Sequence, residues 1–249
     1  MPRRLGQHFL VRQSVLERIA AAVAPEPAGR IVEVGPGKGA LTEHLLTRTG
    51  QLIAIEIDQV LAHYLRAKFR EYQTLSIVES DVLKTDLAQW GPVVVAGNLP
   101  YYISSPIFEK VLRLGPLLQR AVFLVQKEVA ERVAAGPGSR DYGYLTVQTQ
   151  FLAHAELLFE VPAAAFRPPP KVESAVIRLT PRAVPLAPDT AAFLEFASRC
   201  FQHKRKTLRN NLLPYYGKAV LDGLAETAKR GEQLGIKELV RLHDKLRTG

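Results

Sequence analysis

The chain has 249 residues, 47% of them hydrophobic, which is enough for one full-sized core and a small second domain. Its 33 Lys and Arg residues exceed its 24 Asp and Glu residues, and the formal net charge of +9 indicates a polyanionic partner unless the basic surface serves only solubility. The single cysteine, Cys200, excludes an internal disulfide and a cysteine-based zinc cluster, so we expect no metal centre.

The N-terminal residues 1–13 are basic but are not followed by the long apolar run of a signal peptide. No window of the chain approaches the uninterrupted apolar length that a membrane helix needs. We therefore expect a soluble, cytoplasmic protein without a membrane partner.

Strand and helix patterns alternate in the first half of the chain. The predicted strands are 30–35, 51–58, 75–81, 93–99 and 121–127. The predicted helices are 14–24, 40–49, 59–72, 105–114 and 127–135. Runs of Val and Ile with little alternation suit a parallel sheet that is covered on both faces. The repeated units therefore predict a doubly wound α/β domain.

Two further strand-like pieces, 156–166 and 173–181, flank a proline-rich corner at 167–170. The segment 182–190 contains two prolines and is typical of a linker. Only helical patterns follow, at about 190–202, 204–213, 217–229 and 235–247.

Most of the positive charge lies in the last quarter of the chain, since residues 182–249 hold 13 Lys and Arg against 7 Asp and Glu. We expect an α/β domain over residues 1–181 and a small, basic, all-helical RNA-binding domain over 182–249.

A glycine-rich loop, EVGPGKGALT, joins the first strand of the α/β domain to a helix. Its glycines at 35, 37 and 39 permit tight turns and close approach of a ligand, at the edge where such sheets bind ligands. The spacing GxGxG differs from the dinucleotide fingerprint GxGxxG and from a P-loop. Taken alone, the loop is also compatible with a simple tight turn.

Acidic residues end the next two predicted strands. Glu56 can accept both hydroxyls of a ribose, and Asp81 can accept an amino proton of adenine. Because three consecutive strands present suitable groups at one edge, an adenosine-containing ligand is favoured, either NAD or S-adenosylmethionine (SAM). Glu33, before the glycine loop, is unfavourable beside a pyrophosphate but suits a sulfonium or an α-amino group, so the residues favour SAM.

The segment NLPY ends the fourth predicted strand at the same edge. An amino nitrogen conjugated with a purine is a poor nucleophile because its lone pair is delocalised. The Asn98 side-chain oxygen and the Leu99 carbonyl can accept its two protons and localise that lone pair. Pro100 would fix the turn, and Tyr101 would offer a stacking face to a flipped-out base. Positioning would supply most of the catalysis; the alternative is a turn that only packs the sheet edge.

Six segments, in order, resemble the rRNA adenine N6-dimethyltransferase family: GQHFL, EVGPGKGALT, EID, DVLK, NLPYYISSPI and FRPPPKVESAVIRL. The resemblance is greatest to the KsgA-like branch, which dimethylates two adjacent adenines near the 3′ end of small-subunit (16S) rRNA, and it spans residues 3 to 181. It implies the SAM-dependent methyltransferase fold, a seven-stranded, mostly parallel sheet with an antiparallel last strand. It also implies a role in maturation of the small ribosomal subunit.

The resemblance further implies which residues line the SAM site. They are His8, Leu10, Gly35, Gly37, Glu56, Asp81, Val82 and Asn98. His8 stands where many relatives have Asn; both donate a hydrogen bond, but His adds a titratable group. Phe166 would stack on the target adenine opposite Tyr101, unless it is a core aromatic beside the proline-rich corner.

A basic cluster lies in the helical part of the chain: Lys204, Arg205, Lys206 and Arg209. On a helix, residues 205 and 209 would share a face. Such a run usually marks a solvated face, but beside a base-modifying site it favours contact with an RNA backbone. Backbone contacts carry little sequence information. We therefore expect recognition of an RNA shape within an immature ribosomal subunit, by a monomer.

Other functions stay open at this point. A relative of the antibiotic-resistance type would act on large-subunit rRNA, and an RNA-binding assembly or transcription factor would keep a SAM pocket without turnover. The second has no need for the hydrogen-bond geometry of NLPY. A NAD dehydrogenase is disfavoured by the glycine spacing. A cytosine C5 methyltransferase is disfavoured because the only cysteine is far from the fourth strand.

Overall fold

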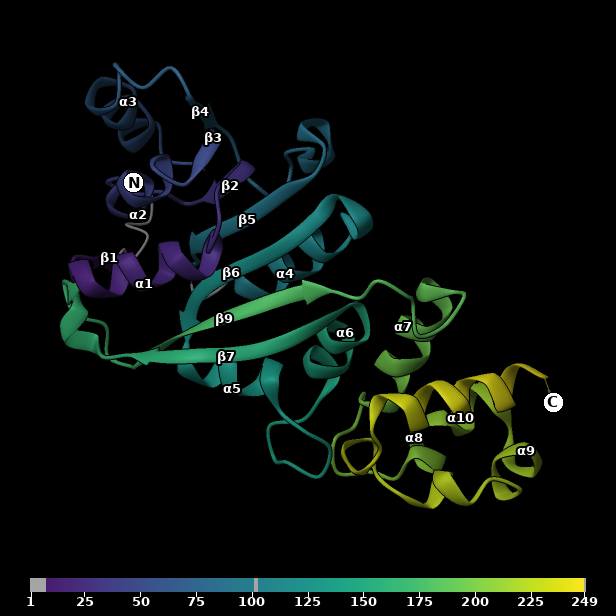
Figure 1. Ribbon diagram of the computed structural model, residues 1–249. Coiled ribbons are helices and arrows are strands. Elements are labelled where there is room, and N and C mark those ends of the chain that lie inside the picture. Colours follow the sequence, from purple (N-terminus) through teal and green to yellow (C-terminus); the bar gives the residue numbers. More distant parts are fainter. Residues whose placement is uncertain (1–7, 101–102, 249) are drawn as a thin grey trace. The chain divides into compact units, whose positions relative to one another are not determined.

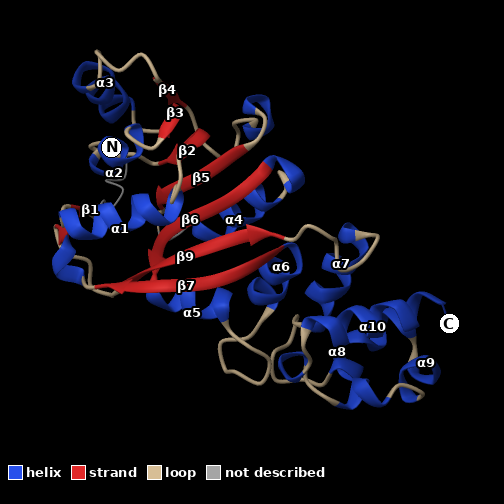
Figure 2. Cartoon of the chain, viewed as in Figure 1, coloured by secondary structure: helices blue, strands red, loops and turns tan. Residues whose placement is uncertain are grey.

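The computed structural model describes residues 8–100 and 103–248. By their internal contacts, the residues form two compact units. The first unit comprises the chain up to Ala130 together with Ala155–Pro181, and the second comprises Glu131–His154 together with the chain from Arg182. Figure 2 shows that strands dominate one unit and helices the other.

A seven-stranded sheet forms the centre of the first unit (Figure 1). Its strands are β2 (Ala28–Val34), β3 (Thr49–Glu56), β4 (Leu75–Glu79), β5 (Val93–Asn98), β6 (Leu118–Gln126), β7 (Ala153–Val161) and β9 (Ser174–Pro181). Their order is β4-β3-β2-β5-β6-β9-β7. Neighbours from β4 to β6 pair in parallel, whereas β9 pairs antiparallel with β6. This confirms the predicted sheet, including its antiparallel last strand.

Helices cover both faces of this sheet. They are α1 (Gln13–Val23), α2 (Ala40–Leu46), α3 (Gln59–Lys68), α4 (Ser104–Leu112) and α5 (Lys127–Ala134). Successive strand residues point to opposite faces, so Val122 and Leu124 of β6 join a buried cluster with α1 and α2. Phe123, between them, stacks on Phe108 of α4 with ring centroids 5.6 Å apart. Burial of both faces explains why the strands are runs of Val and Ile.

A second, two-stranded ribbon joins the N-terminal segment to the proline-rich corner. Strand β1 (Phe9–Leu10) pairs antiparallel with β8 (Phe166–Arg167), and the N–H of Val11 donates to the Ala165 carbonyl over 2.9 Å. The sequence did not predict this ribbon, because strands of two residues show no periodicity.

The second unit has a helical core. Its helices are α6 (Tyr144–Leu152), α7 (Thr190–Cys200), α8 (Leu208–Tyr216), α9 (Lys218–Asp222) and α10 (Ile236–Thr248). Phe151 of α6 stacks on Phe193 of α7 with ring centroids 4.2 Å apart. Both rings belong to one buried cluster with Leu212 and Leu242. The predicted all-helical C-terminal part is therefore confirmed.

The contacts divide the chain differently from the sequence-based boundaries. The expected boundary after Pro181 coincides with one end of the first unit, but residues 131–154 belong with the helices. The sequence patterns also missed α6. The reason is that α6 buries Val147 and Phe151 against segments far along the chain, a contact that no local pattern reveals.

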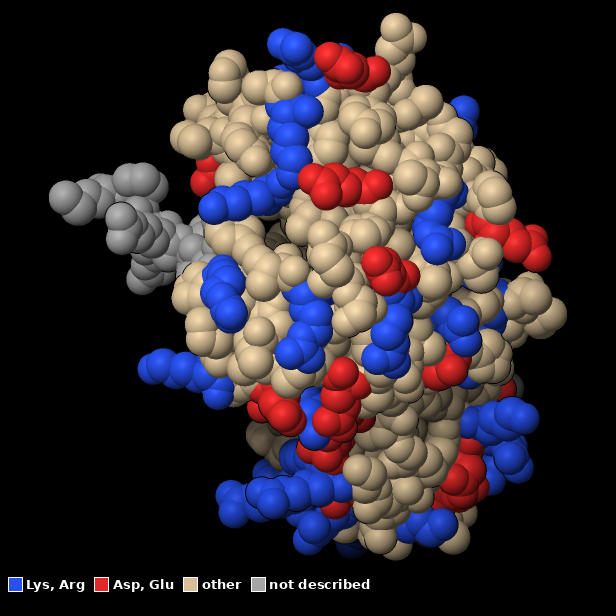
Figure 3. All heavy atoms as spheres, turned by 60° about the vertical axis from the view of Figure 1, so that its left-hand side comes forward, with Lys and Arg blue, Asp and Glu red and all other residues tan. Residues whose placement is uncertain are grey.

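Lys and Arg side chains are spread over the face drawn in Figure 3, with Asp and Glu side chains among them. Within the described residues, no helix is long and apolar enough to span a membrane.

Candidate active site

A cavity of about 460 Å³ lies at the carboxyl ends of β2, β3 and β5, and the N-terminal segment forms part of its wall. All eight residues predicted for the SAM site line it: His8, Leu10, Gly35, Gly37, Glu56, Asp81, Val82 and Asn98. Leu99 and Pro100, predicted to act on the substrate, line it as well. The fold thus brings together residues from five separate parts of the chain.

The glycine loop has a backbone that glycine adopts readily and other residues do not. Gly35, Gly37 and Gly39 have φ angles of 65°, 59° and 79°. The N–H of Gly35 donates to the Ile55 carbonyl over 2.9 Å, and the N–H of Gly37 donates to Glu56 Oε2 over 3.1 Å. The loop is therefore more than a tight turn, because the Gly37 amide holds the acid at the end of the next strand and the Gly35 amide bonds that strand's backbone.

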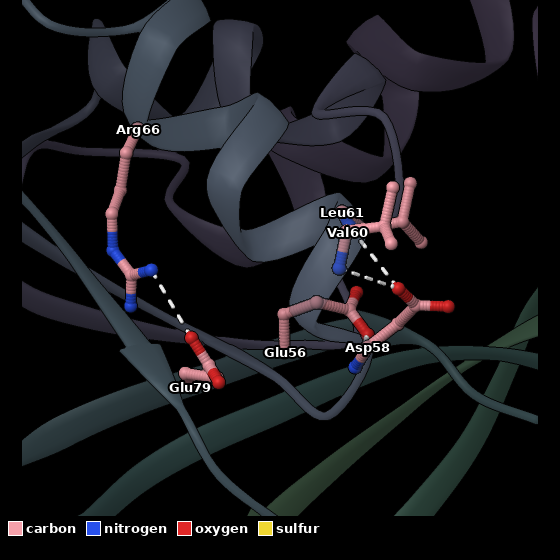
Figure 4. A network of polar contacts seen from close by, with 6 residues as sticks. All are labelled: Glu56, Asp58, Val60, Leu61, Arg66 and Glu79. Carbon is pink, nitrogen blue, oxygen red and sulfur yellow. Dashed lines mark hydrogen bonds and ion pairs between the residues drawn. The ribbon is translucent and has the colours of Figure 1, made fainter.

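Glu56 is 4% exposed, and each of its carboxylate oxygens accepts a backbone N–H. Oε2 accepts from Gly37 and Oε1 accepts from Asp58 over 3.0 Å. A carboxylate has about four lone-pair sites, so acceptor capacity remains for ligand hydroxyls. Burial raises the pKa of Glu56, although these hydrogen bonds lower it. Asp58 in turn caps α3 by accepting from the N–H groups of Val60 and Leu61 (Figure 4).

Glu33 is almost fully buried at the wall of the cavity. Thr42 of α2 donates a 2.7 Å hydrogen bond from Oγ1 to Glu33 Oε2. Burial raises the pKa of Glu33 to about 7; the Thr42 hydrogen bond lowers it and the charge of Glu56 raises it. A nearby cation favours the ionised form of such a group. The cavity therefore favours a positively charged ligand.

The groups around the cavity fit SAM better than a dinucleotide. The Gly37 N–H is engaged by Glu56, so it cannot bind a phosphate, and Glu33 would repel one. The Asp81 carboxylate accepts the Leu83 N–H over 2.9 Å and retains acceptor capacity. Acceptors for a ribose and an adenine, together with a buried acid for a cation, match the three parts of SAM.

Asn98 ends β5, and its side chain is bonded to the N-terminal segment. Its Nδ2 donates to the His8 carbonyl over 3.2 Å. The ring of His8 is also engaged, since Nδ1 lies 2.8 Å from the Pro168 carbonyl oxygen. The N–H of Leu99 donates to the Leu124 carbonyl over 3.0 Å, which continues the β5–β6 pairing past the strand end. The His8 carbonyl thus fixes the orientation of the Asn98 amide, and Oδ1 is its acceptor atom for a ligand.

The two aromatic residues predicted to contact the substrate differ in what the structure says of them. Tyr101 lies outside the described residues. Phe166 is 1% exposed and belongs to the same buried cluster as Leu10, its partner in the β1–β8 ribbon, rather than to the described lining of the cavity. The core interpretation of Phe166 therefore fits this structure, because its ring is buried in that cluster. Reasoning from the sequence missed Phe9 and Lys38, which do line the cavity; the aromatic residue in GQHFL was the available signal.

Comparison with known proteins agrees with this chemistry. A family model described as ribosomal RNA adenine dimethylase matches residues 2–243. The chain belongs to this family. The ribosomal RNA small subunit methyltransferase A of Acidobacterium capsulatum is 44% identical over 251 residues, which cover 96% of this chain and 89% of that protein. The protein of the same name from Bordetella avium is 43% identical over 253 residues, covering 98% and 94%.

Solved structures give the same result. A dimethyladenosine transferase from Plasmodium falciparum aligns with a TM-score of 0.82 and 27% identity over 96% of both chains. The 23S rRNA methyltransferase ErmE aligns with a TM-score of 0.74 and 30% identity, over 96% of this chain and 99% of its own. The first unit thus has the expected SAM-dependent methyltransferase fold, and the chain is a SAM-dependent rRNA adenine dimethyltransferase.

The predicted RNA-contacting residues of this dimethyltransferase lie in the second unit, but not on one helix face. Helix α8 begins at Leu208, and Thr207 Oγ1 caps it. Lys204, Arg205 and Lys206 are exposed in the turn before the cap. The predicted helix over residues 204–213 therefore starts too early. The helix begins only after its cap at Thr207, and residues 204–206 form a turn before it.

Side-chain pairing separates Arg209 from the other three basic residues. Its Nε lies 2.6 Å from Asp222 Oδ1, so its charge is already partnered. The turn itself is held by Asn211, which is 2% exposed. Asn211 Nδ2 donates to the carbonyls of Cys200 and His203, and its Oδ1 accepts the His203 N–H. Hydrogen bonds from a buried side chain of the helical unit therefore fix the backbone just before the basic turn.

Proposed function

We propose that this chain dimethylates the N6 amino groups of two adjacent adenines near the 3′ end of 16S rRNA, during maturation of the small ribosomal subunit in the cytoplasm. The observation that carries the proposal is Asn98, whose Nδ2 is engaged by the His8 carbonyl at the wall of a cavity with a SAM-like set of groups. The choice of subunit is supported by two relatives named small subunit methyltransferase A, which are 44% and 43% identical to this chain, whereas the 23S enzyme ErmE is 30% identical.

The cofactor is held by the acids at the strand ends. Glu56 accepts the ribose hydroxyls, Asp81 accepts from the adenine amino group, and Glu33 balances the positive charge. SAM, when bound, supplies a methyl group on a sulfonium. His8, Leu10 and the glycines of the loop would line the rest of the cofactor site, and Val82 would add an apolar surface for its base.

Asn98 and Leu99 prepare the target nitrogen. Asn98 Oδ1 and the Leu99 carbonyl accept hydrogen bonds from its two N–H groups, which localises the lone pair for attack. Pro100 fixes this turn, and Ser104 at the start of α4 donates from Oγ to the Pro100 carbonyl over 3.2 Å. The methylated amine is cationic and loses a proton readily, so positioning rather than a strong base supplies the rate. After the first transfer one N–H remains, and one acceptor suffices to hold it.

Tyr101 stacks on the target base in this proposal. Phe166 takes part in stacking only if its ring leaves the buried cluster that it shares with Leu10.

The exposed turn of Lys204, Arg205 and Lys206 contacts the phosphate backbone, with Arg209 contributing after release from Asp222. Such contacts recognise an RNA shape, which suits a partly assembled small subunit as the substrate. The enzyme acts as a monomer in this proposal.

Labelled SAM and small subunits from cells that lack this methylation test the proposal. We expect label on two adjacent adenines near the 3′ end of the RNA, and none on subunits that are already methylated. Label on large-subunit RNA alone contradicts the proposed substrate.

The basic turn is tested by the salt dependence of binding to the same subunits. Lys206→Ala should weaken binding and lower the slope of log affinity against log salt by about one. Lys237→Ala, which removes an exposed lysine elsewhere in the same unit, is the matched control and should leave the slope unchanged. Equal slopes for both variants would argue against this contact.

A further inference from the structure

The N-terminal segment is bonded to the proposed catalytic residue. The carbonyl of His8 accepts the side-chain amide of Asn98, and the next two residues form β1 against β8. The segment therefore forms part of the cavity wall and also determines the orientation of the Asn98 amide.

The Phe9 side chain lies against the glycine loop. A Cβ placed on Gly37 would be 3.1 Å from Cε1 and 3.3 Å from Cδ1 of Phe9, so the ring lies close to the bare backbone of that glycine. The Lys38 ammonium lies 4.9 Å from the ring centroid, within the range of a cation–π contact. The carbonyl of Lys38 in turn accepts from Lys68 Nζ over 3.0 Å. The ring thus has a defined seat on a loop that is itself held in place.

The ring and the His8 carbonyl are neighbours along the backbone. Movement of the ring from its seat shifts the carbonyl that engages Asn98 Nδ2. An amide without this partner can turn over and present Nδ2 instead of Oδ1. Two N–H donors would then face each other at the target nitrogen, and its lone pair would not be localised.

We propose that Phe9 is a positioning residue for methyl transfer: its contact with Gly37 and Lys38 holds the His8 carbonyl against Asn98 and so keeps Oδ1 directed at the substrate amine. This inference rests on the proposed role of Asn98, and it assigns Phe9 a task beyond lining the cavity.

Kinetics at saturating SAM test the proposal, because the ring also lines the cavity and its loss alters the KM for SAM. Phe9→Ala should lower kcat by roughly 10- to 100-fold, the scale expected for a misplaced catalytic group. Phe9→Tyr keeps the ring and should stay within about threefold of the parent enzyme. Lys38→Gln, at an exposed position, should lower kcat by about two- to fivefold.

A matched control exists in the same unit. Arg18 lies over the ring of Phe159, with Cζ 3.8 Å from the centroid, and neither residue lines the described cavity. Phe159→Ala removes a ring of the same kind and should keep the parent kcat. A parent-like kcat for Phe9→Ala at saturating SAM overturns the proposal, as does an equal loss in both alanine variants.

The amide of Asn98 gives a readout that needs no RNA and no turnover. The signals of its side-chain NH2 group are assigned by their loss in Asn98→Ala. The hydrogens of this group should exchange slowly with solvent in the parent protein and in Phe9→Tyr. They should exchange fast in Phe9→Ala and at an intermediate rate in Lys38→Gln. Unchanged exchange in both weakened variants overturns the inference. Failure to label small-subunit RNA would instead reject the proposed substrate and leave this measurement valid.

Discussion

Glu33→Gln tests whether the cavity holds an acid that stays protonated without a ligand. The glutamine has a similar size and can still accept the Thr42 hydrogen bond, but it cannot ionise. The pKa of Glu33 rises from 4.5 to about 7, so the unfolded chain loses this proton at lower pH than the folded chain. The protonated group therefore contributes its full stability below about pH 4.5, and this contribution is lost as the pH rises through about 7.

The gap between the two pKa values corresponds to about 3 kcal/mol, at about 1.4 kcal/mol for each pH unit. Without ligand, Glu33→Gln should match the parent protein near pH 4 and exceed its free energy of unfolding by up to about 3 kcal/mol near pH 8. The affinity of Glu33→Gln for SAM should be lower than that of the parent protein near pH 8, because the carboxylate that balances the cation is gone.

Urea unfolding followed by the fluorescence of Trp90 measures this effect, since Trp90 is the single tryptophan and lies in the same unit as Glu33. Glu43→Gln removes an exposed acid that is paired with Lys68 on the surface, and it should show no such dependence on pH. The reasoning is refuted if the difference between Glu33→Gln and the parent is the same at both pH values.

Three further changes probe separate parts of the molecule. Asn98→Ala should abolish methyl transfer while calorimetry still detects SAM binding; loss of binding with residual transfer would reverse the assigned roles. In Gly97→Ala the new Cβ clashes with the Val34 carbonyl oxygen of the neighbouring strand, which should lower the free energy of unfolding by about 1–3 kcal/mol. An unchanged urea midpoint would contradict this expectation. Asn211→Ala leaves the buried Cys200 carbonyl without its side-chain partner and should lower the stability of the helical unit by about 1–3 kcal/mol. Circular dichroism measures this loss, because Trp90 lies in the other unit. A thermal midpoint equal to that of the parent would show that the turn does not need this residue.

Much of the α/β unit could be predicted from local patterns. Runs such as VVVAG predict buried parallel strands because both faces of the sheet are covered. The carboxyl ends of parallel strands meet at one edge, so the positions of Glu56 and Asp81 at two strand ends were enough to place them together. The same patterns missed α6, and they placed the start of α8 too early, because a cap at Thr207 and burial against α7 decide those elements.

The basic residues show a second limit of sequence reasoning. A charge run says which residues are cationic, but not which are already partnered. Arg209 is paired with Asp222, thirteen residues along the chain, whereas Arg205 and Lys206 are exposed. Only packing of α8 against α9 brings that pair together.

The fold class and the meeting of Glu56, Asp81 and Asn98 at one cavity follow from the amino-acid sequence, because they depend on periodicity and on residue type at strand ends. What surrounds these groups depends on packing between distant segments. Packing engages Asn98 with the His8 carbonyl, ninety residues away in the chain, seats Phe9 on Gly37 and buries Phe166 beside Leu10. Such contacts leave no local signature, because they arise when segments that are remote in sequence pack against each other.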